Sequence, residues 1–192
     1  ELERYRTLGP RKLTQLLIEA IKEEGVEGQT VLDIGGGVGA IQHELLKAGA
    51  GNSTGVDAST AYIMAAEQEA RAQGHAWRMN YVYGNFVEIA GDIQPADIVT
   101  LDRVICCYPD LERLLGLSSQ RATRIYGVVF PMDSWASRSL ARLFNSYLWL
   151  RRNPFRFFVH PSSAVDGLLR RSGFRRSFYH KSRLWQVAVY RR

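Results

Sequence analysis

The spacing of apolar residues along the chain alternates between a helical and a strand-like pattern. Residues 13–21 place apolar side chains three and four positions apart, so they predict a helix with one buried face. Residues 30–34 form a short β-rich run that ends where a glycine cluster begins. The same criteria predict helices near 10–24, 40–48, 59–73, 109–116, 135–150 and 162–172, and strands near 30–34, 53–56, 77–83, 96–101, 124–130, 174–179 and 184–190.

The order of these elements predicts the fold class. Five strands alternate with helices, and this order favours a parallel sheet, because parallel neighbours need a crossover connection. The last two strands are joined by a short polar turn near Lys181-Ser182, which forces them to run antiparallel. We therefore expect an α/β fold with a seven-stranded, mainly parallel sheet, helices on both faces and a C-terminal antiparallel strand pair.

A glycine-rich turn leaves the first predicted strand and enters the next helix. Gly35, Gly37 and Gly39 follow a G-x-G-x-G pattern, and Ala40 also completes the dinucleotide pattern G-x-G-x-x-A. Glycines let a ligand approach the backbone, and a helix N-terminus offers free N–H groups. The turn alone therefore predicts a nucleotide-containing cofactor and leaves S-adenosylmethionine and NAD as alternatives.

Two aspartates stand at the ends of neighbouring predicted strands. Asp33 lies two residues before Gly35, where a carboxylate suits the cationic end of a methionine moiety and would repel a pyrophosphate. Asp57 ends the second strand, where it can accept hydrogen bonds from the ribose hydroxyls of either cofactor. The helix before the first strand and the closing strand pair also favour S-adenosylmethionine over NAD.

Three segments resemble motifs of the class I, Rossmann-like methyltransferases that depend on S-adenosylmethionine. Residues 31–39, which read Val-Leu-Asp-Ile-Gly-Gly-Gly-Val-Gly, resemble motif I, and residues 55–59 resemble the second motif. Residues 84–86 resemble the step after strand three that contacts adenine in the family. Asn85 replaces the usual acid there, and its amide oxygen can still accept a hydrogen bond.

A fourth segment, residues 97–110, resembles the strand-four region of the same family, with Cys107 where a histidine is common. The resemblance spans residues 10–130 and implies S-adenosylmethionine as cofactor and S-adenosylhomocysteine as product. We interpret the activity as methyl transfer to oxygen or nitrogen of a small molecule. The cofactor-binding residues implied by the resemblance are Asp33, Gly35, Gly36, Gly37, Gly39, Asp57, Ala58, Ser59, Asn85, Phe86, Asp102, Arg103 and Val104.

We expect one methyltransferase domain over residues 1–192. Within it, residues 1–28 form an N-terminal helix region, 29–130 the cofactor-binding core, and 131–192 a substrate-side cap with the C-terminal hairpin. The third part matches the family only in architecture. Because substrate choice usually resides there, the identity of the methyl acceptor and of the methylated atom stays open.

The stretch 135–152 combines aromatic residues with arginines. It predicts either a cap helix that covers the substrate pocket with Trp135, Phe144 and Tyr147, or a surface helix that lies on anionic lipid. We favour the cap, because a helix that follows strand five is expected to cover the sheet.

No catalytic residue stands out, and three side chains are weak candidates. Asp102 follows strand four and could act as a base, Tyr108 could bind substrate, and His160 could act as a base. Each also has an ordinary interpretation, respectively a cap, a packing tyrosine and a surface histidine. No His, Cys and Asp cluster has metal-ligand spacing, so we expect no metal, and the adjacent Cys106 and Cys107 are interpreted as small hydrophobic residues.

The distribution of charge along the chain bears on which molecule the protein methylates. Residues 1–120 carry 10 Lys/Arg and 17 Asp/Glu, whereas residues 121–192 carry 15 and 2, for net charges of −7 and +13. We interpret the basic part as a solvated arginine-rich surface or, alternatively, as one that attracts an anionic substrate, an anionic membrane surface or nucleic acid. Porphyrin O-methyltransferases share the layout of an upstream helix, a glycine loop and a basic C-terminal portion. An RNA- or protein-modifying methyltransferase is the main alternative. An NAD-dependent oxidoreductase and a non-catalytic binding module are the others.

The remaining expectations concern the cellular setting. No apolar run reaches the roughly 20 residues that span a bilayer, and no signal peptide is visible. Two adjacent cysteines cannot form a disulfide framework, so we expect a reducing cytoplasm. The chain begins at Glu1 rather than Met, which leaves open whether a segment precedes it, and its oligomeric state stays open too.

Overall fold

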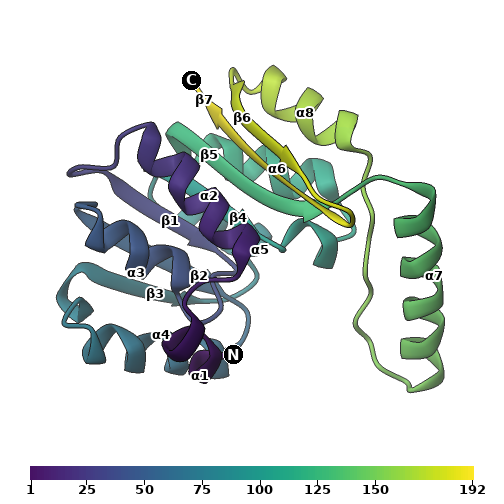
Figure 1. Ribbon diagram of the computed structural model, residues 1–192, viewed down its shortest axis with the longest axis horizontal. Coiled ribbons are helices and arrows are strands. Elements are labelled where there is room, and N and C mark those ends of the chain that lie inside the picture. Colours follow the sequence, from purple (N-terminus) through teal and green to yellow (C-terminus); the bar gives the residue numbers. More distant parts are fainter.

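The computed structural model describes residues 1–192 and contains one seven-stranded sheet in the order β3-β2-β1-β4-β5-β7-β6 (Figure 1). The strands are β1 (Thr30–Ile34), β2 (Asn52–Asp57), β3 (Met79–Tyr83), β4 (Ala96–Asp102), β5 (Ala122–Pro131), β6 (Arg175–Lys181) and β7 (Trp185–Arg191). The helices are α1 (Leu2–Leu8), α2 (Lys12–Glu23), α3 (Ala40–Lys47), α4 (Thr60–Ala72), α5 (Phe86–Ile89), α6 (Leu111–Gln120), α7 (Trp135–Leu150) and α8 (Ser162–Arg171).

Strands β1 to β5 run parallel, and β7 pairs antiparallel with both β5 and β6. The expected fold class is therefore confirmed. The chain builds the sheet outward from β1 to β3 on one side and then crosses to β4 on the other side of β1. This reversal of strand order opens a crevice beyond the carboxyl ends of β1 and β4, where open α/β sheets bind their ligands.

Two apolar cores cover the two faces of the sheet, and strand β4 contributes to both. Ile98 packs in one core with Leu17 of α2. Its neighbour Val99 packs in the other with Leu115 of α6 and Leu169 of α8. This alternation follows from the two-residue period of a strand, and burial of each such side chain contributes about 1.5–3 kcal/mol. The sheet is thus fixed from both faces beneath the crevice.

The boundaries differ from the sequence-based expectation where tertiary contacts override the local pattern. Residues Ala76–Arg78 form a 3-10 turn, so β3 begins later than expected, and β5 is longer at both ends. The sequence pattern did not predict α1, which has only seven residues and no side-chain cap. A helix that short is marginal by itself, and it is held by the buried side chain of Tyr5.

The expectation that the helix after strand five covers the sheet is wrong. Figure 1 shows α7 projecting away from the sheet, with the following segment 151–161 running back beside it. The sheet has no free surface at β5, because α2 packs on β5 and β7, and α6 packs on the other face. We define α7 together with residues 151–161 as the arm. No helix in the structure is long and apolar enough to cross a membrane.

The arm is held together by few contacts. Only Ser137, Ala141 and Leu148 of α7 are buried. Asn145 joins the helix to the returning segment, because its side-chain amide donates to the carbonyl of Phe157 at 2.8 Å and accepts from the N–H of the same residue at 2.8 Å. The arm therefore has defined local structure although most of its surface is exposed.

Candidate functional site

The glycine-rich turn lies at the crevice and admits no side chain at two of its positions. Gly35 has a positive φ of 67°, and a Cβ atom there would lie 2.5 Å from a methyl carbon of Val104. A Cβ atom on Gly36 would lie 2.5 Å from Oδ2 of Asp33. The turn leads directly into α3, whose first turn presents free N–H groups. Bare backbone and helix N-terminus together form a cradle for a polar ligand.

A cavity of about 570 Å³ lies against this cradle. Its sheet side is formed by Asp33, the glycine turn, Asp102 and Arg103. Its other side comes from the N-terminal region, through Tyr5 of α1, Arg11 and Thr14 of α2 and the residues beside them. The unpredicted helix α1 thus helps to enclose the crevice.

Asp33 is buried at the end of β1 and has one unpaired oxygen. Its Oδ1 accepts a hydrogen bond from Thr100 Oγ1 at 2.7 Å, whereas Oδ2 has no partner. Burial raises the pKa of this carboxyl from 3.8 to about 7; the Thr100 hydroxyl opposes the shift, and the charges of Asp102 and Asp57 add to it. An unpaired carboxylate oxygen beside a cavity suits an ammonium group, so the residues present fit the amino-acid end of S-adenosylmethionine.

Asp57 ties the glycine turn to the end of β2. Its Oδ2 accepts from the Gly37 N–H at 3.1 Å, and its Oδ1 accepts from the Ser59 N–H at 2.8 Å. Each carboxylate oxygen has a second lone pair, so both can still accept a ribose hydroxyl. Ser59 caps α4 by accepting from Tyr62 N, and Ala58 between the two residues is exposed.

Asp102 and Arg103 form a network at the end of β4. The Arg103 guanidinium donates to both carboxylate oxygens of Asp102, at 3.0 Å each, and to Thr14 Oγ1 at 3.1 Å, while the Thr14 hydroxyl donates to Asp102. Burial raises the pKa of Asp102, and the Arg103 charge opposes that shift. Because these hydrogen bonds occupy it, Asp102 serves here to hold Arg103 and α2 in place.

Arg103 has an unusual backbone conformation. Its φ of 60° lies in the left-handed region, which only one other non-glycine residue of the chain enters. This conformation costs about 1–2 kcal/mol, and such strain tends to persist at functional sites. It directs the guanidinium across the ring of Trp185, 5.4 Å from the ring centroid.

Seven of the predicted cofactor residues do not line the large cavity: Gly39, Asp57, Ala58, Ser59, Asn85, Phe86 and Val104. Asn85 caps α5, accepting from Val87 N at 3.3 Å and donating to Glu88 at 3.0 Å. The side chain of Phe86 is buried in the core beneath. Val104 also packs against this core, where it contacts the glycine turn. Asn85, Phe86 and Val104 lie on the flank of the crevice, at the ends of strands β3 and β4.

Tyr108 and His160, 52 residues apart in the chain, are brought together. The His160 Nε2 lies 2.9 Å from the backbone carbonyl of Tyr108. Because a carbonyl can only accept, Nε2 carries the proton and Nδ1 keeps its lone pair in the neutral ring. The imidazole stacks on Phe158 at 6.0 Å between centroids. Neither candidate lines the large cavity.

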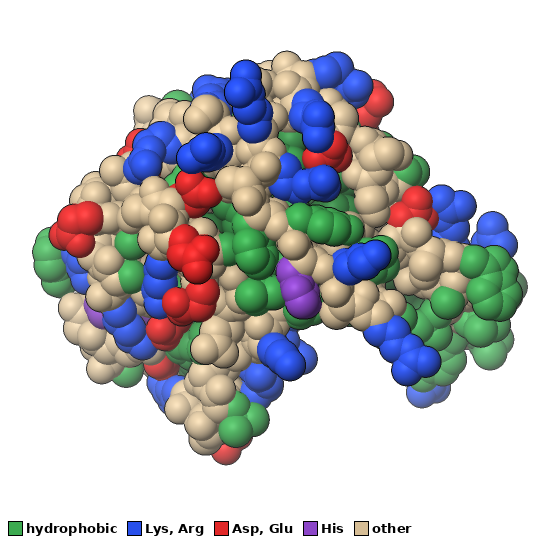
Figure 2. All heavy atoms as spheres, turned by 45° about the horizontal axis from the view of Figure 1, so that its top comes forward, with side chains coloured by type: hydrophobic (Ala, Val, Ile, Leu, Met, Phe, Trp, Pro, Cys, Tyr) green, Lys and Arg blue, Asp and Glu red, His purple; other side chains and the backbone are tan.

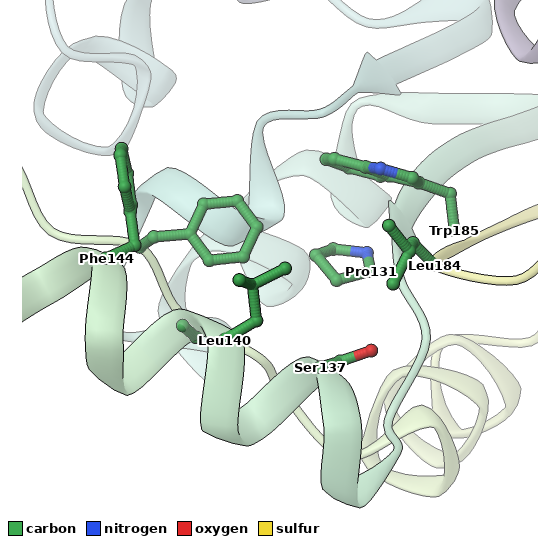
Figure 3. A pocket seen from close by; sticks show the side chains of 8 residues that line it. Pro131, Ser137, Leu140, Phe144, Leu184 and Trp185 are labelled. Atoms are coloured by element: carbon green, nitrogen blue, oxygen red, sulfur yellow. The ribbon is translucent and has the colours of Figure 1, made fainter.

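A second cavity, of about 280 Å³, lies between α7 and the start of β7. Figure 3 shows Leu140 pointing from α7 into the space that Pro131, Leu184 and Trp185 border on the other side. The lining is almost entirely apolar. Trp185 belongs to both cavities, so one indole separates the polar crevice from the apolar pocket.

Three residues of this arrangement escaped sequence reasoning: Thr14, Thr100 and Trp185. Thr14 contacts a side chain 88 residues away, and Thr100 one 67 residues away. No local motif marks either residue. The position of Trp185 follows only from the sheet order, which inserts β7 between β5 and β6.

Comparisons with known proteins agree with this geometry. Residues 31–120 match the family model of a methyltransferase domain. A search among curated protein sequences gives no significant match. The structure is similar to magnesium protoporphyrin IX methyltransferase from Synechocystis PCC 6803 with bound S-adenosylhomocysteine, with a TM-score of 0.74 and 16% identity over 94% of this chain and 81% of that one.

Two further solved structures share the fold. An O-methyltransferase family protein from Burkholderia thailandensis aligns with a TM-score of 0.73 and 18% identity, over 94% of this chain and 56% of that one. The cyclase SpnF aligns with a TM-score of 0.70 and 14% identity, over 94% and 80%. Likeness at such identities shows the fold, while the family model indicates a methyltransferase domain. Over residues 31–120 the chain matches a methyltransferase domain, and its fold is that of the solved methyltransferases to which it is similar.

Proposed function

We propose that the protein transfers the methyl group of S-adenosylmethionine to an oxygen or nitrogen atom of a small-molecule acceptor, and that the apolar part of this acceptor binds between α7 and β7. The observation that carries the proposal is the shared indole of Trp185 between the polar crevice and the apolar pocket. A methyl donor in one cavity and an acceptor in the other would have to meet beside this indole, where the two cavities adjoin, because the methyl carbon and the acceptor atom must be in direct contact. Such alignment is the main contribution a protein makes to methyl transfer.

The proposal assigns a place to each part of the cofactor. Asp33 and the glycine turn would hold the amino-acid end, and Asp57 the ribose. Asn85 and Phe86 flank the side on which the adenine would lie. The cofactor itself supplies the activated methyl group, so the residues of this chain need to align it and exclude water.

The acceptor side of the proposal rests on shape and charge. Leu140 and Phe144 offer an apolar surface, while Arg103 offers a guanidinium over the ring of Trp185. A planar acceptor with an anionic group fits both features. The similar protein from Synechocystis is named for magnesium protoporphyrin IX, and we propose anionic tetrapyrroles among the acceptors to try first.

His160 lines neither cavity, so we propose it as a base only for an acceptor that extends beyond the apolar pocket toward Tyr108. The Tyr108 carbonyl fixes its proton on Nε2, and Nδ1 keeps the lone pair needed to accept another. Because Asp102 is held by Thr14 and Arg103, we propose it as a positioning residue. Tyr108 would contribute mainly through its backbone carbonyl.

We also propose the cytoplasm as the location. Cys106 and Cys107 are free thiols whose sulfur atoms lie 3.9 Å apart. Exposed thiols such as that of Cys107 persist in reducing compartments.

A labelling experiment tests the proposed function. The protein is incubated with S-adenosylmethionine carrying a tritiated methyl group, together with either the small-molecule or the macromolecular fraction of a cell extract. We expect label in a new small-molecule product, separated from S-adenosylmethionine by chromatography, and much less of this product with Asp33→Asn. Label in RNA or protein alone would contradict the proposal and favour the basic C-terminal part as a docking surface for a macromolecule.

A further inference from the structure

The outer face of α7 is exposed and apolar. Leu143 and Leu150 are 70% and 74% exposed, and the two tryptophans near the ends of the helix, Trp135 and Trp149, are 84% and 70% exposed. Tyr147 lies between the two leucines on the same side and is also exposed. Five large, exposed apolar side chains on one 16-residue helix are uncommon on a monomer and indicate an interaction site.

The charges around this face have one sign. No acidic residue occurs between Ser134 and Val165, whereas five arginines do. Only one of them, Arg138, forms an ion pair, with Asp133 at 2.7 Å. Arg151 lies over the ring of Tyr147, 5.7 Å from its centroid. The other three arginines are Arg142, Arg152 and Arg156.

This charge pattern argues against a second copy of the chain as the occupant. A twofold contact brings the same patch of both subunits together, so arginines would face arginines with no carboxylate between them. An anionic lipid surface satisfies both features. Its acyl region accepts leucine and tryptophan side chains, and its phosphates accept hydrogen bonds from arginine.

The shape of the molecule allows this contact. The arm projects from the body, so the outer face of α7 is accessible along its length (Figure 1). Figure 2 shows hydrophobic side chains and basic side chains gathered together on the projecting part at the right. At 16 residues, α7 is too short to span a bilayer and fits a helix that lies in the interface.

We propose that the outer face of α7 docks the protein reversibly on an anionic lipid bilayer. Leu143 and Leu150 insert below the headgroups, Trp135 and Trp149 lie at the interface, and arginines of the arm bind lipid phosphates. The inner face of the same helix lines the pocket between α7 and β7, so docking leaves that pocket at the membrane surface. The binding itself is independent of the proposed methyl acceptor.

Sedimentation with lipid vesicles tests the proposal. The full chain is mixed with vesicles of phosphatidylcholine alone, or with about 30% phosphatidylglycerol added as the anionic lipid. We expect binding to the anionic vesicles only, weakened as salt is raised because the charges are screened. Leu143→Ser with Leu150→Ser should lower the affinity at least about tenfold, since each leucine contributes its burial.

Two controls keep the result interpretable. Met64→Ser with Trp77→Ser removes equally exposed apolar side chains from outside the arm and should leave binding unchanged. Arg142→Gln with Arg152→Gln should remove the preference for anionic over neutral vesicles. The affinity for S-adenosylmethionine, measured on each variant, verifies that it is folded.

Two outcomes would overturn the proposal. One is equal or absent binding to neutral and anionic vesicles at saturating lipid. The other is a dimer in solution that Leu143→Ser with Leu150→Ser dissociates, which would show that a second copy covers this face.

Discussion

The cofactor crevice and the arm differ in how firmly their side chains are held. In the crevice, each polar group is fixed by elements far apart in sequence, as when Thr100 holds Asp33 and Thr14 holds Asp102. The arm is held by Asn145, by the contacts of Phe157 with Phe144 and Trp185, and by the hydrogen bonds of its last residues to the body. The difference fits the roles proposed above: a rigid site for the methyl donor and a more loosely packed surface for the acceptor.

The largest expected effect tests the rigidity of the crevice. Gly35→Ala places a Cβ atom against Val104 in a left-handed conformation, so we expect a loss of about 2–5 kcal/mol in the free energy of unfolding and a loss of cofactor binding. Gly37→Ala is the matched control, because it has a similar φ of 57° and no atom within 4 Å of its Cβ. Denaturant unfolding compares the two variants. Equal stabilities would show that crowding by Val104 does not matter.

Asp33→Asn tests whether the charge of Asp33 contributes to cofactor binding. The variant keeps an acceptor for Thr100 and loses the charge, so the affinity for S-adenosylmethionine should fall by about 10- to 100-fold. Calorimetric titration measures this change. A variant that binds the cofactor as tightly as the original protein would place the ammonium group elsewhere.

The same carboxyl predicts a dependence of stability on pH. Its pKa is raised in the folded state, from 3.8 to about 7, so between these values the folded protein holds a proton that the unfolded chain has lost. Stability of the ligand-free protein should therefore fall as pH rises through this range, by up to about 4 kcal/mol. Asp33→Asn should remove this contribution, which unfolding curves at several pH values would reveal.

Cofactor affinity should show the reverse trend with pH. An ammonium group binds the ionised carboxylate, so the affinity for S-adenosylmethionine should rise as pH increases toward and past the Asp33 pKa of about 7. The analogue 5′-methylthioadenosine lacks the amino-acid end and serves as the control ligand. Parallel pH profiles for the two ligands would contradict the assigned role of Asp33.

The smallest expected effect lies on the arm. Phe144→Ala removes an aromatic wall of the apolar pocket, so the KM of an apolar acceptor should rise about tenfold while cofactor affinity stays unchanged. Leu143→Ala, one residue earlier on the outer face, should leave the KM unchanged in the absence of lipid. Steady-state kinetics with both variants would show whether the inner face of α7 contacts the acceptor.

The sequence predicts the elements around the crevice but not the position of α7. The strand alternation, the glycine turn and the closing strand pair rest on local patterns, and the structure contains each of them. The position of α7 depends on which sheet surfaces remain free, and that is decided by α2 and α6. Periodicity along α7 shows that the helix is amphipathic, but it cannot distinguish a buried apolar face from an exposed one.

The candidate site also contains residues that the sequence predicts and residues that it does not. Asp33 and Asp57 could be assigned because they stand next to recognisable strand ends. Thr14 and Trp185 could not, because their partners lie elsewhere in the sequence and no spacing rule relates them. Such residues become visible only when the sheet order is known.

The indole of Trp185 also has a thermodynamic consequence. Since one side chain borders both cavities and carries the Arg103 guanidinium on its ring, a ligand that orders it in one cavity reduces the entropy cost of binding in the other. Donor and acceptor should therefore bind cooperatively, and each should raise the affinity of the other by the same factor. Replacing the indole with a smaller side chain should bring that factor toward one, so that the two ligands bind independently.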